Sequence, residues 1–314
     1  MFYTDNLQDQ RKRAVLKVRA KVLNSARSWF NDQGFTEVQG PTIIPATGEW
    51  SGYFEVKYFE KKAFLAQGLQ PYADVFVAHL GKIYTIAPAF RAEKVRTNRH
   101  LTEYWRIEAV TPQCDLNEMI RIQEELLTHI CHSLASDSIE ELTHLHRHAK
   151  DLKKIEAPFP KVTYDEAIEM LQKENTNVFW GKPLSRELEK KISLQFDQPF
   201  FVTDFPVSAE TFFYKSNTKR PELTLSAELL APEGYGEIAG GGQMITEKEV
   251  LLKKMAEENI DTADQRWYLN LRRLGSVPQS GFMIGLERFI QWLCNLEHIK
   301  DTLVFPRLPD NIYP

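Results

Sequence analysis

The segment Gly281–Arg288, GFMIGLER, constrains the fold more than any other part of the chain. Arg288 falls in the first turn of a predicted helix, where free backbone N–H groups favour anions and a planar guanidinium can hold a phosphate. A core strand followed by a solvated arginine would fit the same letters. In either case the segment predicts a short strand, a turn at Gly285 and an amphipathic helix whose apolar face carries Phe289, Trp292, Leu293, Leu296 and Ile299.

Two further segments contain polar residues that are suited to ligand or metal binding. Residues 83–109 predict two antiparallel strands joined by a long polar loop. Residues 223–243 contain two acids, Glu228 and Glu237, followed by a glycine run that lets a ligand approach the backbone. Because Mg²⁺ is bound through one or two carboxylates plus phosphate oxygens, the two acids are candidate metal ligands, with two solvated acids beside a turn as the alternative.

The composition excludes several classes of protein. The hydrophobic share of 43% and the charged share of 26% are typical of soluble globular proteins, and a net charge of −4 provides no overall attraction to nucleic acid. The three cysteines show neither metal nor disulfide spacing. With no apolar signal region and no run of 18 apolar residues, we expect a cytoplasmic protein without membrane contact.

Three motifs in this order resemble the catalytic domain of class II aminoacyl-tRNA synthetases, in the asparaginyl/aspartyl branch. They are a helix and proline-containing strand at about 8–45, FRAEKVRTNRHLTEYWRIE within about 83–109, and GSVPQSGFMIGLER within about 275–300. The resemblance implies an α+β fold with a mostly antiparallel sheet flanked by helices, a single catalytic domain over residues 1–314, and a homodimer formed through the first motif. No anticodon-binding domain is expected, because only Met1–Asn6 precede the first helix. In this the chain resembles free-standing archaeal asparagine synthetase-related proteins.

The resemblance assigns ATP-binding roles to residues that match the family. Arg91 and Arg288 would be the catalytic residues, which position the α-phosphate and neutralise charge as a carboxylate attacks it. Tyr104 would stack under the adenine, where the family usually has phenylalanine. The other implied ATP contacts, ending with the two Mg²⁺ ligands, are Glu93, Arg99, His100, Glu228 and Glu237.

The positions implied to bind the acid depart from the family. The loop glutamate that grips the substrate ammonium falls at Gly48, and Glu49 beside it is the candidate replacement. Ala73 and Met244 replace a lysine and an arginine that hold the side chain of the substrate, and Met283 replaces a small residue. Two polar positions of this implied pocket are retained, Gln67 and Gln70.

The retained and changed positions together predict a working ATP-dependent ligase with altered acid specificity, using ATP and Mg²⁺ and producing AMP and diphosphate. A buried substrate group left without a partner costs about 1–3 kcal/mol, which disfavours aspartate and asparagine. We expect adenylation of an amino acid or related carboxylic acid, followed by transfer to an amine, ammonia or another small acceptor.

Three alternatives stay open. They are aminoacylation of tRNA, which is not favoured, synthesis of asparagine, and a non-catalytic regulator that binds an adenylate or amino acid. The sequence names neither the acid nor the acceptor. Glu210, where the family has a lysine, carries no predicted effect.

Overall fold

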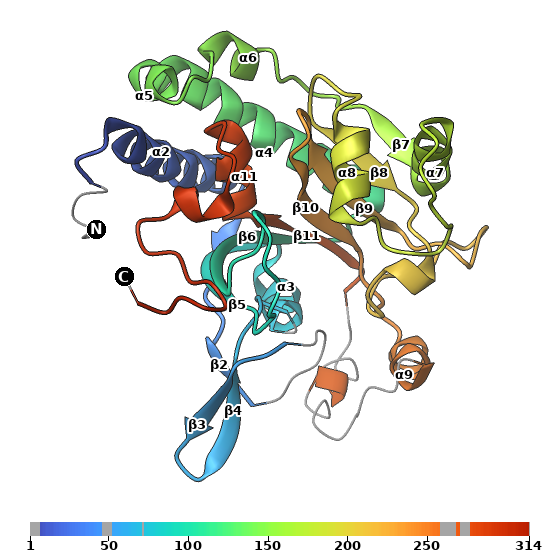
Figure 1. The fold of residues 1–314 in the computed structure, drawn as a ribbon. Coiled ribbons are helices and arrows are strands. Elements are labelled where there is room, and N and C mark those ends of the chain that lie inside the picture. Colours follow the sequence, from blue (N-terminus) through green and yellow to red (C-terminus); the bar gives the residue numbers. More distant parts are fainter. Residues whose placement is uncertain (1–6, 46–51, 71, 258–267, 271–276, 314) are drawn as a thin grey trace.

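The computed structural model describes residues 7–45, 52–70, 72–257, 268–270 and 277–313, drawn as a coloured ribbon in Figure 1. An eight-stranded mixed sheet runs in the order β1–β5–β6–β11–β10–β9–β8–β7. Its outermost pairs, β1–β5 and β7–β8, are parallel, and the pairs between them are antiparallel. The strands are β1 (Thr36–Glu37), β5 (Ile83–Phe90), β6 (Glu103–Pro112), β7 (Lys161–Thr163), β8 (Phe200–Thr203), β9 (Ser226–Ala231), β10 (Gly236–Gln243) and β11 (Gln279–Gly285).

A smaller sheet, in the order β2–β4–β3, projects from the body (Figure 1) and contains β2 (Ile43–Ile44), β3 (Glu55–Tyr58) and β4 (Lys61–Leu65). The longer helices are α2 (Gln10–Asp32), α3 (Ala73–Leu80), α4 (Leu116–Asp137), α7 (Tyr164–Lys173), α8 (Arg186–Ser193), α9 (Lys248–Glu257) and α11 (Leu286–Leu293). The short ones are α5 (Ile139–His144), α6 (Ala149–Lys153) and the 3₁₀ turns η1 (Val207–Ala209) and η2 (Ile299–Thr302). Among the residues described, no helix combines the length and the apolar character needed to cross a membrane.

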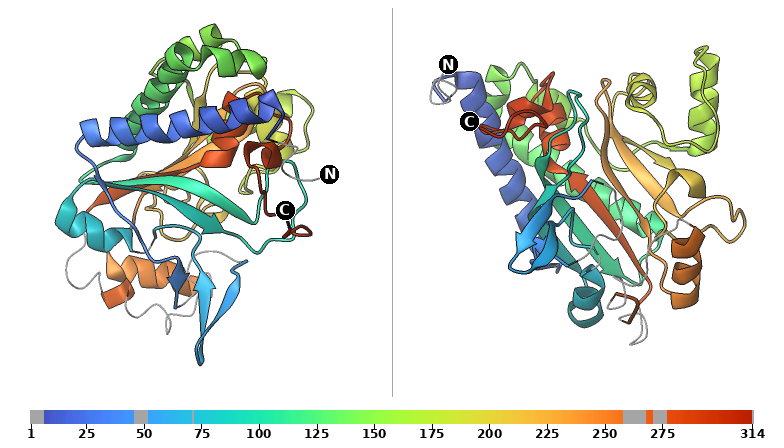
Figure 2. Two further views of the ribbon diagram at one scale, coloured as in Figure 1. Left: turned by 90° about the vertical axis from the view of Figure 1, so that its left-hand side faces the viewer. Right: turned by 60° about the horizontal axis from the view of Figure 1, so that its bottom comes forward.

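The two faces of the large sheet have different roles. Figure 2 shows α2 and α4 on one side of the sheet, with α3 and α9 on the other. Successive side chains of a strand point to opposite faces. On β6, Ile107 and Ala109 therefore pack in the main core under α2 and α4, while Arg106 and Glu108 point to the opposite side. We call this second side the open face, and the candidate site lies on it.

A buried ion pair fixes α11 to two other elements. The Glu287 side chain is 1% exposed, and its Oε2 atom accepts a hydrogen bond from the backbone N–H of Trp105 on β6 at 2.8 Å. The Glu287 Oε1 atom lies 2.7 Å from Nη1 of Arg19 on α2. Burial raises the pKa of Glu287, and Arg19 opposes that shift. The three segments that carry the predicted motifs therefore meet at one carboxylate, next to Arg288.

The predicted helix after Gly285 is shorter than expected. Its apolar face extends through Leu293, where α11 ends, and Asn295 then has a φ of 51°. Because an L-residue with positive φ cannot continue a right-handed helix, Leu296 and Ile299 lie outside it. Both are nevertheless buried, and Ile299 opens η2. The expectation that these two residues belong to the helix was wrong, although their burial was predicted.

Candidate active site

A cavity of about 530 Å³ opens on the open face. Its lining comes from the loop between β5 and β6 and the start of β6, from η1 and the two residues after it, from β9 and β10, from the junction of β11 with α11, and from Ile299 at the start of η2. Eight of the residues predicted from the sequence line it, and they are Arg91, Arg99, His100, Tyr104, Glu228, Glu237, Met283 and Arg288. Segments far apart in the chain are therefore brought to one place.

Strand register explains why the glycine run lies in the middle of the cavity. Glu108 pairs with Met283, Met283 with Gly240, and Gly240 with Glu228, so these residues form one row across β6, β11, β10 and β9. A Cβ atom on Gly240 would approach only Glu237 Oε1, at 3.9 Å. The row is therefore open at its centre, and ligand atoms can reach the sheet between Met283 and Glu228.

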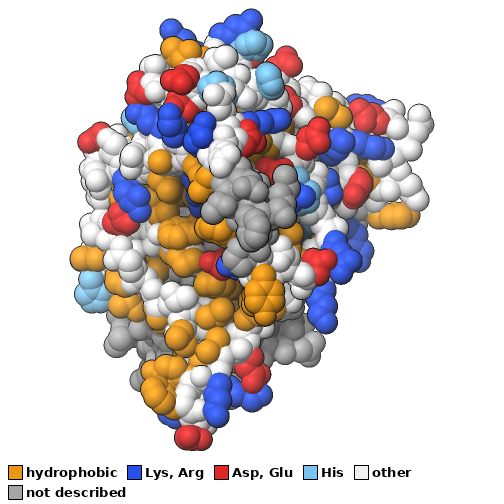
Figure 3. All heavy atoms as spheres, turned by 60° about the vertical axis from the view of Figure 1, so that its left-hand side comes forward, with side chains coloured by type: hydrophobic (Ala, Val, Ile, Leu, Met, Phe, Trp, Pro, Cys, Tyr) orange, Lys and Arg blue, Asp and Glu red, His pale blue; other side chains and the backbone are white. Residues whose placement is uncertain are grey.

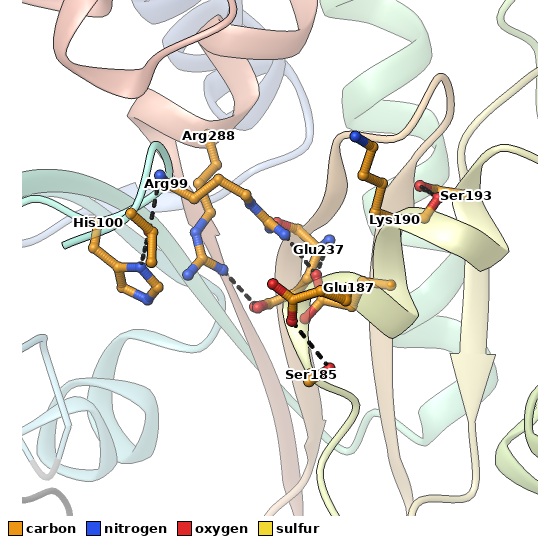
Figure 4. A network of polar contacts seen from close by, with 10 residues as sticks. Arg99, His100, Ser185, Glu187, Lys190, Ser193, Glu237 and Arg288 are labelled. Carbon is orange, nitrogen blue, oxygen red and sulfur yellow. Dashed lines mark hydrogen bonds and ion pairs between the residues drawn. The ribbon is translucent and has the colours of Figure 1, made fainter. Parts of the chain in front are cut away.

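Two arginines hold Glu237. Nη1 of Arg288 donates to Oε2 of Glu237 at 2.6 Å, and Arg99 donates to the Glu237 carbonyl oxygen (Figure 4). Arg99 also pairs with Glu189 of α8, at 2.7 Å. Burial alone would raise the pKa of Glu237, but Arg288 and Arg99 outweigh it and hold that pKa below its usual range. Glu237 is therefore an ionised carboxylate inside a cationic frame.

Glu228 differs from Glu237 in its polar contacts. In the part of the chain that the structure describes, we find no hydrogen bond or ion pair to its carboxylate, although Glu228 lines the cavity. Burial, followed by the nearby Glu237, Glu189 and Glu210, raises the pKa of Glu228 well above its ordinary value. A carboxylate crowded by other carboxylates is stabilised by a cation.

The donor set suits Mg²⁺. The described residues include no group of three or more His, Cys, Asp or Glu side chains arranged to hold a metal ion. Mg²⁺ is usually bound by only one or two carboxylates, with phosphate oxygens and waters completing its shell. Glu228 and Glu237 therefore fit an ion that arrives with a nucleotide.

The loop between β5 and β6 supplies further polar groups. Arg91 forms an ion pair with Glu93, which lies outside the cavity lining, and the Arg91 Nε atom is buried with no hydrogen-bond partner among the described residues. The guanidinium of Arg106 lies 5.4 Å from the Tyr104 ring centroid and donates to its hydroxyl at 3.0 Å. Burial, then Arg288 and Arg91, lowers the pKa of His100 to about 4, so its imidazole is neutral near pH 7.

The residues predicted to bind the acid are less well assembled. Met283 lines the cavity, whereas Met244 is buried in an apolar cluster with Phe212, Phe213 and Tyr214. Ala73 is buried among apolar neighbours at the start of α3. Gln67 and Gln70 are also outside the lining: Gln67 donates to the Gly52 carbonyl at 3.2 Å, and Gln70 is partly exposed. Glu49 lies outside the described residues.

Sequence reasoning gave no role to four polar residues of this region. Arg106 and Glu108 share a face with Tyr104 through strand alternation, a signal present in the letters YWRIE. Glu108 accepts from the Leu69 backbone N–H at 3.1 Å, and burial raises its pKa. Glu189 of α8 lies in no motif, and Glu210 after η1 was noted in the sequence only as a departure from the family, so the tertiary structure was needed to give their contacts.

Comparison with known proteins gives a consistent result. The family model described as tRNA synthetases class II (D, K and N) matches residues 3–309. The asparagine–tRNA ligase of Pyrococcus furiosus is 39% identical over 302 residues, covering 96% of this chain and 70% of the relative. The asparagine–tRNA ligase of Koribacter versatilis is 37% identical over 315 residues, covering 98% of this chain and 71% of the relative.

Solved structures agree. An asparaginyl-tRNA synthetase from Pyrococcus horikoshii complexed with asparaginyl-adenylate superposes with a TM-score of 0.94 at 39% identity, covering 97% of this chain and 70% of the other. An Entamoeba histolytica asparaginyl-tRNA synthetase in complex with asparaginyl-adenylate gives 0.86 at 28% identity, covering 96% and 69%.

These comparisons confirm the predicted α+β synthetase fold and the predicted resemblance. At the level of the family they also confirm an ATP-dependent, adenylate-forming ligase that uses Mg²⁺. Both the sequence and the fold lead to the same assignment: the chain belongs to the class II tRNA synthetases of the D, K and N group.

Proposed function

We propose that this chain activates a carboxylic acid with ATP and passes the acyl group to the 3′ end of a tRNA. One observation carries the first step: the Arg288–Glu237 pair and the unpaired carboxylate of Glu228 line the same cavity. A nucleoside triphosphate bound with Mg²⁺ needs an arginine near its phosphate oxygens and one or two carboxylates near the metal ion, and the cavity provides both.

The chemistry is mainly placement and charge neutralisation. A carboxylate oxygen of the acid attacks the α-phosphorus of ATP, a P–O bond forms, and diphosphate leaves. Arg91 and Arg288 hold phosphate oxygens in line and offset the charge that develops there. Glu228 and Glu237 would hold Mg²⁺, which would neutralise further phosphate charge when bound. The neutral imidazole of His100 can donate a hydrogen bond to a phosphate oxygen without titrating near pH 7.

Different observations bear on the acceptor and on the acid. The relatives are tRNA ligases over 96–98% of this chain, which favours a tRNA acceptor over a small amine. The acid pocket favours a changed substrate, because Met283 lines the cavity and Met244 is in an apolar cluster. An amide ligase that acts on a small amine is the second candidate, and this altered pocket is the observation in its favour.

ATP–pyrophosphate exchange against a panel of amino acids and related carboxylic acids tests the first step. We expect exchange with one acid or a small group of acids. Aminoacylation of total tRNA with that acid, weakening steeply as salt rises, would support the tRNA acceptor. Acyl transfer to ammonia or a small amine, without charging of tRNA, would contradict the tRNA acceptor and support the amide ligase. ATP binding without exchange for any acid would contradict an adenylating function.

We also propose that two copies of this chain associate through the face shown in Figure 3. Hydrophobic side chains gather on that face. Ile43 of β2 and Phe54 beside β3, in the small sheet that follows the first motif, are exposed although apolar. A large exposed apolar patch marks an interface, and a second copy is the occupant that the first motif predicts. Sedimentation velocity should give a dimer, with Ile43→Glu shifted to monomer and the distant Leu194→Glu unchanged. A monomeric wild type at micromolar concentration would contradict this proposal.

A further inference from the structure

Arg99 lies among other charged groups, at the point where the loop between β5 and β6 reaches the cavity. Its side chain is 8% exposed, and the guanidinium of Arg288, which lines the same cavity, carries a charge of the same sign. Burial, followed by the charge of Arg288, lowers the pKa of Arg99. Because a buried cation beside another cation is destabilised, Arg99 needs a counterion to stay in this place.

Glu189 of α8 is that counterion. Its Oε2 atom lies 2.7 Å from Nη1 of Arg99, and the same oxygen accepts a hydrogen bond from the backbone N–H of Glu237 at 2.8 Å. The Nη2 atom of Arg99 donates to the carbonyl oxygen of Glu237. Three contacts therefore form a closed ring that joins α8, the start of β10 and the loop before β6.

The backbone of β10 lies directly against this ring. A Cβ atom on Gly236, the first residue of β10, would be 2.6 Å from Nη1 of Arg99 and 2.6 Å from Oε2 of Glu189. Gly236 also has a φ of 73°, which favours glycine. Hydrogen bonding and close packing together therefore hold the guanidinium of Arg99 in one orientation.

Glu189 lies behind Arg99 as seen from the cavity. Arg99 lines the cavity, whereas Glu189 is buried and is not among the lining residues. A guanidinium has five N–H donors, and the contacts with Glu189 and Glu237 use two of them, so donors remain for a ligand. Glu189 therefore acts on a ligand through the groups that it holds.

We propose that Glu189 is a positioning residue, which holds Arg99 in the orientation that binds the phosphates of ATP. This inference rests on the proposed adenylation, and it gives a role in nucleotide binding to a helix outside the three motifs. Its physical basis is preorganisation, because an arginine that is already oriented loses little conformational freedom when phosphate binds. A misplacement of about 1 Å can cost on the order of 100-fold in rate.

The test compares the wild type with Glu189→Ala, with the isosteric Glu189→Gln and with a control, Glu169→Ala, at an exposed position of α7. Pyrophosphate exchange gives separate KM values for ATP and for the acid. Calorimetry with ATP and Mg²⁺ gives a Kd without turnover. A purely structural loss of folded protein lowers kcat but leaves KM and Kd unchanged, so these constants separate positioning from folding.

We expect Glu189→Ala to raise KM and Kd for ATP by at least about 10-fold, as loss of a charge-assisted contact allows. Glu189→Gln should have a smaller effect, because its amide oxygen still accepts hydrogen bonds but carries no charge. The KM for the acid should stay within about twofold in both variants, and Glu169→Ala should match the wild type. In an Arg99→Ala background, Glu189→Ala should have little further effect, since Glu189 acts through Arg99.

Equal or tighter binding of ATP by Glu189→Ala would overturn the inference. So would equal rises in KM for ATP and for the acid, or effects of Glu189→Ala and Arg99→Ala that simply add. If the wild type binds ATP but exchanges with no acid, the proposed adenylation fails, and the Kd values still decide the role of Glu189. Absence of ATP binding by the wild type would overturn both proposals.

Discussion

Arg288→Ala is expected to lower ATP–pyrophosphate exchange by roughly 10²–10³-fold, the loss typical when one preorganised donor to a developing charge is removed. Arg288 lines the cavity and lies 2.6 Å from Glu237, so its guanidinium is held in place before substrate binds. Its removal also leaves Arg99 and Arg91 as the cations that act on Glu237. Exchange is measured at saturating ATP with the acid identified in the panel.

Two variants separate catalysis from folding. Arg288→Lys keeps the charge but loses the planar fork, and we expect it to recover only part of the rate. Arg121→Ala removes an arginine from the exposed side of α4 and should retain the full rate. A correctly folded Arg288→Ala protein, judged by its circular dichroism and melting temperature, with exchange within threefold of the wild type would contradict the proposed role.

Glu228→Gln is expected to raise the Mg²⁺ concentration needed for half-maximal exchange by at least about 10-fold, because one of two proposed carboxylate ligands becomes neutral. The same change should stabilise the ligand-free protein. Since Glu237, Glu189 and Glu210 surround Glu228, a glutamine removes a buried like-charge contact. Loss of activity together with a gain of stability distinguishes a ligand-binding carboxylate from a structural one.

The pH dependence of the melting temperature gives an independent check on the surroundings of Glu228. Its folded-state pKa lies well above the ordinary glutamate value of 4.5, so the folded protein binds the extra proton. Stability from this group is therefore present below about pH 4.5 and is lost as the pH rises through the folded-state pKa. Glu228→Gln should flatten this fall in melting temperature, and Glu55→Gln on the hairpin should not. An unchanged Mg²⁺ requirement in Glu228→Gln would contradict the metal site.

The same substitution made separately at Glu228 and at Glu237 gives a further test, because the two carboxylates have different neighbours. Glu237 is paired with Arg288, and its pKa is lowered in spite of burial. Glu228 is unpaired within the described residues, and its pKa is raised. The same substitution at the two positions should therefore change stability in opposite directions, which follows from their neighbours rather than from their residue type.

Sequence patterns alone predicted the fold class, the order of the motifs and many of the polar residues that line the cavity. These features are local: GFMIGLER predicts strand, turn and helix, and YWRIE alternates between two faces of one strand. The end of α11 at Leu293 was not predicted, because Leu296 and Ile299 remain apolar and buried after the helix has stopped. The periodicity of apolar residues in a sequence indicates which side chains are buried, but it does not show where a helix ends.

The charged pairs of the site were visible only in the folded chain. Glu189 reaches Arg99 from α8, and Glu210 reaches Ser226 of β9 from the turn after η1, across 90 and 16 residues of sequence. It also separated Met283, which lines the cavity, from Met244, which packs in an apolar cluster. Such pairings depend on strand register and on how helices pack over a sheet. Those contacts join distant segments, so no local pattern of residues can specify them.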